Sequence, residues 1–92
     1  MSIHKEKIIL EKCHNNNLIY ILLGELISSD NNFTEGMLNT NLSILKAYNR
    51  AIRYTNIEKD DKKEYSKFIK NGIEILKNEL KKYDKRRLHV SP

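Results

Sequence analysis

The residues of this chain that could do chemistry as a pair are Cys13 and His14, with His4 and Glu11 near them in the sequence. A thiol beside a histidine is used in nucleophilic catalysis, and both side chains are zinc ligands. Neighbouring residues of a helix point about 100° apart, so Cys13 and His14 cannot easily bind one metal ion. The pair also lacks a third residue to orient the histidine and a glycine-rich loop to bind an oxyanion. We therefore predict no catalytic, metal-binding or cofactor-binding residues, and no enzymatic activity.

Basic side chains form two groups, each with the spacing of one helix face. The first lies opposite the apolar residues of a predicted helix over residues 34–55, and comprises Lys46, Arg50, Arg53 and Tyr54. The second lines the polar face of a predicted helix over residues 62–84, and comprises Lys63, Lys67, Lys70, Lys77 and Lys81. Like charges four residues apart repel each other on a helix, so helix stability does not favour this pattern. A solvated lysine-rich face is the commoner explanation, and an anionic partner is the functional one.

The charge and length of the chain narrow the class of protein. The net charge of +5 comes from residues 62–92, which carry ten basic and four acidic side chains, whereas residues 1–61 carry seven and eight. Ninety-two residues predict one domain over 1–92. A single cysteine excludes an internal disulfide and suits a reducing compartment, and the apolar run at residues 8–10 is too short for the core of a signal peptide. We therefore predict a cytoplasmic protein.

The segment from Leu18 to Ile27 is the most apolar in the chain, and its apolar residues would surround a helix on all sides. Such a helix is either buried or embedded in a membrane, and ten residues are far fewer than the roughly 20 that a membrane span needs. The segment therefore predicts a core helix or a subunit interface. We expect a homo-oligomer, because this helix has more apolar surface than two partner helices would cover. The predicted partner-binding residues are Leu18, Ile19, Leu22, Leu23 and Leu26.

Apolar residues recur at helical spacing throughout the chain, and three glycines and one proline are too few for turn-rich β structure. The spacing predicts helices over residues 3–28, 34–55 and 62–84, arranged as an all-α, up-down-up antiparallel three-helix bundle, with a flexible tail over 85–92. A strand over residues 18–23 is a weaker alternative. The run His14-Asn15-Asn16-Asn17 interrupts the first helix. Either the helix continues through it, which we favour because nothing else marks a turn, or it breaks and Asn17 caps a second helix.

Four residues make further local predictions. Thr34 is expected to cap the second helix, and Asp61 with Glu64 resembles a capping box at the start of the third. Asn41 interrupts an apolar stripe, as a residue at the rim of the core or as a buried residue that sets the register of packing. Gly72 lies at the centre of the third apolar stripe, which predicts close approach of a neighbouring backbone beside residues 18–27.

These observations favour a small regulatory or inhibitor-type protein that binds another macromolecule, most simply a protein, through a helical surface. The alternative is a nucleic-acid-binding protein that uses Arg50, Arg53 and the lysines of the 62–84 helix, although no helix-turn-helix signature is present. A second alternative is an oligomer that binds a small anionic ligand or nucleotide at subunit junctions, where Arg50 and Tyr54 would meet a neighbouring subunit.

Overall fold

The computed structural model describes the backbone of residues 3–28 and 33–90, and the side chains within these ranges up to residue 83. This part of the chain forms helices and no strand, which confirms the all-α prediction and makes the strand alternative for residues 18–23 wrong. The elements are α1 (His4–Asn15), α2 (Ile19–Ile27), α3 (Glu35–Ala51), the 3-10 turn η1 (Ile52–Tyr54) and α4 (Lys59–Val90).

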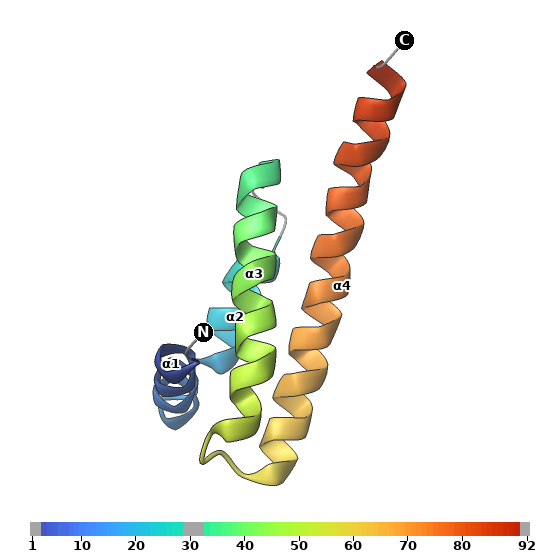
Figure 1. The fold of residues 1–92 in the computed structure, drawn as a ribbon. Helices are drawn as coiled ribbons and strands as arrows, with labels where there is room; N and C mark the ends of the chain where they lie inside the picture. The colour runs from blue at the N-terminus through green and yellow to red at the C-terminus, as the bar shows by residue number, and fades with distance from the viewer. Residues whose placement is uncertain (1–2, 29–32, 91–92) are drawn as a thin grey trace.

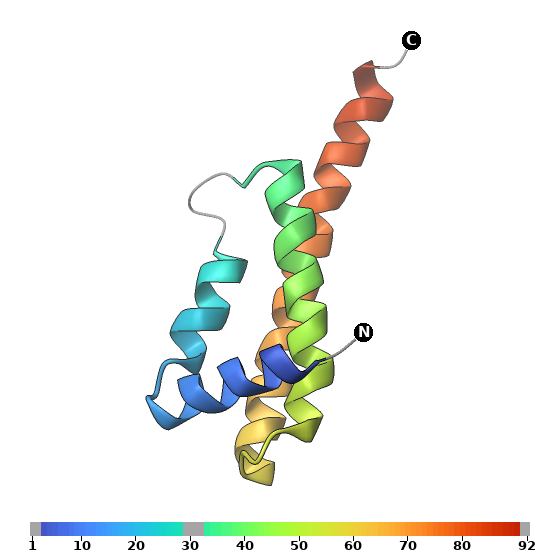
Figure 2. The same cartoon turned by 60° about the vertical axis from the view of Figure 1, so that its left-hand side comes forward.

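The three helices α2, α3 and α4 lie side by side, and α1 crosses them near one end (Figures 1 and 2). α2 and α4 run in the same direction, and α3 runs in the opposite one. α3 contacts each of the other three helices and packs most extensively on α4. α4 is the longest element and continues past the end of α3. The fold therefore differs from the predicted three-helix bundle in its first element. Two helices replace the predicted 3–28 helix: α1, which crosses the others, and the short α2, which runs parallel to α4.

The predicted continuity of the 3–28 helix is wrong, because Asn17 adopts a left-handed backbone conformation that ends the first helix. Asn17 has a φ of 58°, in the left-handed region that asparagine tolerates better than most residues. The Leu18 amide donates to the Cys13 carbonyl at 2.7 Å, and the Asn17 amide donates to the His14 carbonyl at 3.1 Å. This is the Schellman pattern that ends a helix. Asn17 therefore terminates α1 and does not cap α2, whose first turn has no side-chain cap.

α3 begins as predicted. The Oγ1 of Thr34 accepts a hydrogen bond from the Met37 amide at 3.2 Å, which satisfies one of the free amides of the first turn. The helix ends at Ala51, and the residues predicted as its last turn form η1 and a short connection instead.

α4 differs from its prediction at both ends. It begins at Lys59, so Asp60 and Asp61 lie inside the first turn, where carboxylates interact favourably with the helix dipole. The predicted Asp61–Glu64 capping box is therefore wrong, and the Glu64 carboxylate instead accepts a hydrogen bond from Tyr20. The helix continues to Val90, so most of the predicted flexible tail is helical, and residues 91–92 lie outside the described residues.

Side chains from all four helices and from the α3–α4 connection form one core. Its buried apolar members are Leu10, Ile19, Leu23, Leu38, Leu42, Leu45, Tyr48, Ala51, Ile52, Ile57, Ile69, Ile73 and Leu76. Gly72 lies against Ile27, and a Cβ on this glycine would be 2.6 Å from Ile27 Cγ1. The predicted close approach is confirmed, but the neighbour is a side chain of α2 and not its backbone. Asn41 is half-buried, and its Nδ2 donates to the Leu26 carbonyl at 3.2 Å, which satisfies a carbonyl of the last turn of α2.

Candidate anion-binding face

The cations predicted from the sequence lie on two adjoining helices. Along α3 and η1 they follow steps of four and three residues, and along α4 they follow steps of three, four and seven, so each set forms one stripe. All eight are exposed. We call them the basic face: Lys46, Arg50, Arg53, Lys63, Lys67, Lys70, Lys77 and Lys81. Tyr54 follows Arg53 at the end of this face, and 63% of its surface is exposed.

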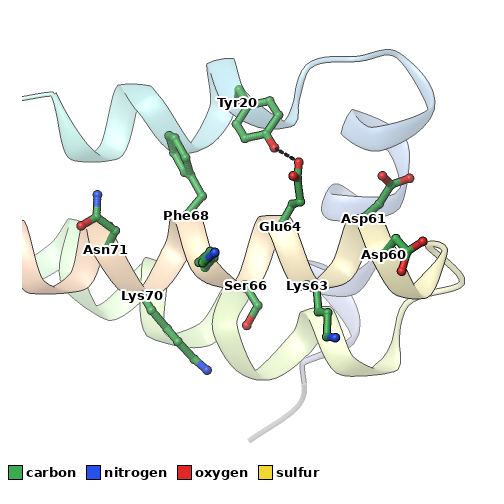
Figure 3. A pocket seen from close by; sticks show the side chains of 10 residues that line it. Tyr20, Asp60, Asp61, Lys63, Glu64, Ser66, Phe68, Lys70 and Asn71 are labelled. Carbon is green, nitrogen blue, oxygen red and sulfur yellow. Dashed lines mark hydrogen bonds between the residues drawn. The ribbon is translucent and has the colours of Figure 1, made fainter.

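Helix geometry brings the two stripes to the same side of the molecule. On α4, Phe68 and Gly72 face α2, and Figure 3 shows Lys63 and Lys70 pointing away from that side. On α3, Asn41 faces α2 through its hydrogen bond to the Leu26 carbonyl. Lys46 and Arg50 lie about 140° and 180° around the helix from Asn41, so this stripe also points away from α2. The turn that ends α3 is also tied to the start of α4, because Lys62 Nζ donates to the Arg53 carbonyl at 3.2 Å.

The cations of the basic face have no anionic partners among the described side chains. Ion pairs form elsewhere among the described side chains. Lys82 Nζ lies 3.0 Å from Glu79, and His14 Nε2 lies 4.0 Å from Asp61, a contact that is an ion pair only if the histidine is protonated. Neither pair includes a residue of the basic face. α4 carries eleven basic and six acidic residues, whereas the rest of the chain carries six of each. The whole net charge of +5 therefore belongs to α4, and the face is a site of positive potential.

The other side of α4 carries an aromatic cluster, which we define as His14, Tyr20, Tyr65 and Phe68. The Tyr65 hydroxyl and His14 Nδ1 share a hydrogen bond of 2.8 Å, and the Tyr20 hydroxyl donates to Glu64 at 3.3 Å. The Tyr20 ring meets the rings of Phe68 and Tyr65 edge to face at 5.1 and 5.6 Å. These contacts join the end of α1 and the start of α2 to the first turns of α4.

The environment of the cluster disfavours ionisation of its two tyrosine hydroxyls. Burial raises the pKa of Tyr20 and of Tyr65 above the ordinary tyrosine value, and the carboxylates of Glu64 and Asp61 raise it further. Both hydroxyls therefore remain neutral hydrogen-bonding groups at neutral pH. The sequence analysis missed this cluster, because its members are up to 54 residues apart and Tyr65 and Phe68 read only as parts of an apolar stripe.

An open depression of about 1210 Å³ surrounds the first turns of α4. Figure 3 shows that its lining residues lie on opposite sides of the helix: Tyr20, Glu64 and Phe68 on the α2 side, and Lys63 and Lys70 on the other. These side chains do not converge on one point, so the depression does not form a closed site for a small ligand.

The fold separates the side chains of Cys13 and His14. Cys13 is half-buried against the core, whereas His14 contacts Tyr65 and Asp61. Among the described residues, no group of three or more His, Cys, Asp and Glu side chains could hold a metal ion.

Most of the predicted apolar partner-binding residues pack in or against the core of the chain itself. Ile19 and Leu23 are buried, and Leu22 and Leu26 are half-buried against the core, so these four side chains are engaged in the fold of the chain itself. Leu18 is 44% exposed. The exposed apolar residues that the prediction missed are Tyr20 and Ile21, at 48% and 60%. The reason is the break at Asn17, which lets the short α2 turn its apolar side onto α3 and α4.

No family model, curated protein or solved structure matches this chain. Within the described ranges, no helix combines the length and the apolar character that crossing a membrane requires.

Proposed function

We propose that this protein is a small non-enzymatic protein of the regulatory type, which acts by binding an anionic macromolecule through the basic face. One observation carries the proposal: eight exposed cations from α3, η1 and α4 share one side and have no anionic partner among the described side chains. Their mutual repulsion opposes folding, and a polyanion would relieve it. A cytoplasmic location remains part of the proposal, supported by the single cysteine.

Two features support the non-enzymatic part of the proposal. His14 is engaged in holding α1 against α4, and Cys13 packs against the core, so the residues nominally able to do chemistry have structural contacts. The basic face offers lysines and arginines on the outside of a helix pair, where they can bind charge but do not enclose a reacting group.

The experiment that tests this function measures retention on immobilised heparin, a generic polyanion, for two variants with the same net charge. Lys70→Gln/Lys77→Gln removes two cations from the basic face, and Lys5→Gln/Lys12→Gln removes two exposed cations from α1. We expect the face variant to elute at clearly lower salt than the α1 variant. Equal elution of the two would show that only net charge matters and would refute the proposed binding face.

A second candidate function is self-association through the outer side of α2, which would make the protein a homo-oligomer. The exposure of Leu18, Tyr20 and Ile21 favours it, because burial of such side chains drives association. In such an oligomer, Arg50 and the exposed Tyr54 could also meet a neighbouring subunit around a small anion. Light scattering during size-exclusion chromatography tests the idea: the native chain should be larger than a monomer, and Ile21→Lys should return it to a monomer. A monomeric native chain would refute it.

A further inference from the structure

We infer that the anionic partner is double-stranded nucleic acid, bound through its sugar–phosphate backbones and not through its bases. This inference rests on the proposed function, because it names the partner of the same basic face. Three properties of the face distinguish a duplex from a single strand and from an acidic protein: its length and fixed spacing, its lack of stacking surfaces, and its lysine-rich composition.

The cations of α4 form a long line along one face of the helix, which the exposed carboxylate of Glu74 interrupts between Lys70 and Lys77. Lys63 and Lys81 are eighteen residues apart, which is about 27 Å along a helix. A duplex rises about 3.4 Å per base pair, so this line covers about eight base pairs, most of one turn. α4 packs along α3 over much of this length, so the spacing of the cations is held by the fold. A rigid row of charges matches the fixed phosphate spacing of a duplex better than the variable spacing of a single strand.

The basic face offers charge without a surface on which bases could stack. Proteins that bind single strands combine a basic groove with exposed aromatic rings. Tyr54, at one end, is the exposed aromatic side chain that adjoins this face in the described structure. Tyr20, Tyr65 and Phe68 lie on the other side of α4, beside the carboxylates of Asp61 and Glu64, which would repel phosphates.

The composition of the face argues against an acidic protein as the partner. Six of its eight cations are lysines, a residue that is depleted in protein–protein interfaces, which are built around apolar and aromatic anchors. Apart from Tyr54, the exposed large apolar side chains of the described structure lie elsewhere: Ile8 on α1, Leu18, Tyr20 and Ile21 at and in α2, and Met37 and Ile75 more than about 90° around α3 and α4 from the middle of each cation stripe. Lysine is a compact point charge on a flexible stem and lacks the planar fork of arginine, so a lysine-rich face favours contacts with phosphates, which carry no sequence information.

The test measures fluorescence anisotropy of the full chain with four labelled probes at 50 and 200 mM salt. The probes are a 20-base-pair DNA duplex, the same duplex in RNA, a 20-nucleotide thymidine single strand, and polyglutamate. We expect both duplexes to bind, and the single strand to bind about tenfold more weakly because the face lacks stacking surfaces. For about four phosphate contacts, DNA-duplex affinity should fall about 150-fold between the two salt concentrations.

The two charge-matched variants locate the binding. With Lys70→Gln/Lys77→Gln, the loss of two phosphate contacts should reduce the salt-dependent fall to about 12-fold. With Lys5→Gln/Lys12→Gln, the fall should stay near 150-fold. These residues are exposed, so both variants are expected to fold, and circular dichroism checks that they do.

The outcomes separate this inference from the proposed function. A single strand that binds as tightly as the duplexes would overturn the inference and leave the binding of polyanions in place. Binding of polyglutamate in preference to both nucleic acids would do the same and would make an acidic protein the partner. No binding of any probe at 50 mM salt, or an equal loss in the two variants, would overturn both.

Discussion

The two sides of α4 carry polar side chains in opposite situations. On the α2 side, the polar groups of the aromatic cluster have partners: Tyr65 with His14, and Tyr20 with Glu64. On the other side, the lysines that α4 contributes to the basic face are exposed and have no anionic partner among the described side chains. Paired and half-buried polar groups hold a fold together, whereas repelling surface charges destabilise it. The comparison indicates that the first side holds the helices together, whereas the second side makes no such contacts within the described part of the chain and is the side to which we assign the proposed binding.

The largest expected effect tests whether α2 belongs to the structural side. Leu23→Ala should lower the free energy of unfolding by about 2–5 kcal/mol, because Leu23 is completely buried and its truncation leaves a cavity. Ile21→Ala, on the exposed side of the same helix, should change it by less than about 0.5 kcal/mol. Urea denaturation of both variants measures the difference. Equal effects would mean that α2 is not packed as described.

Features of the fold and of the basic face could be predicted from the sequence where they depend on residues close together in the chain. The helical character of the chain and the Thr34 cap depend on local pattern and were predicted correctly, and close packing at Gly72 was predicted, although its neighbour is the Ile27 side chain and not a backbone. The eight cations of the basic face were also found, because exposure of a charged helix face follows from its spacing. That both cation stripes share one side depends on how α3 packs on α4, and spacing alone does not determine this.

The errors come from choices that local propensity leaves nearly balanced. A run of asparagines permits either a poor helix interior or a left-handed helix end, and the packing of α2 against α3 and α4 selects the second at Asn17. Asp60 and Asp61 are suitable residues either for a helix cap or for a first turn. α4 begins at Lys59, so both aspartates lie in its first turn. The contact between His14 and Tyr65 joins residues 51 positions apart, for which a single sequence carries no signal.

The next prediction compares the two sides of α4 directly. Tyr65→Phe removes the hydroxyl that is hydrogen-bonded to His14, and should lower the free energy of unfolding by about 0.5–1.5 kcal/mol. Lys70→Gln, on the basic face, should change it by less than about 0.5 kcal/mol, because Lys70 is exposed and forms no ion pair with any described side chain. Thermal or urea denaturation at neutral pH measures both. If Lys70→Gln were the more damaging change, the assignment of the two sides would have to be reversed.

Alkaline pH should act on the buried tyrosine of α3. Burial, followed by the charges of Cys13 and Glu6, raises the pKa of Tyr48 above its ordinary value of 10.0. Above about pH 10 the unfolded chain therefore loses this proton while the folded chain keeps it, so the free energy of unfolding falls as pH rises. Urea denaturation at pH 8, 9, 10 and 10.5 should show a steeper fall for the native chain than for Tyr48→Phe. The subtraction removes the contribution of the lysines, which both proteins share, and parallel curves would contradict the prediction.

The smallest expected effect is the most informative about the basic face, because stability and binding should change in opposite directions. Lys63 lies four residues from both Lys59 and Lys67 and near the start of α4, where the helix dipole disfavours a cation. Lys63→Glu converts both repulsions into attractions, at the cost of a new repulsion with Asp60, so it should raise the free energy of unfolding by about 0.5 kcal/mol. The same change should weaken binding to a DNA duplex, because it places a negative charge within the line of cations. A residue that lowers stability where it stands and supports binding there is retained for binding. If Lys63→Glu instead lowered stability and left duplex affinity unchanged, Lys63 would have a structural role and would not belong to the basic face.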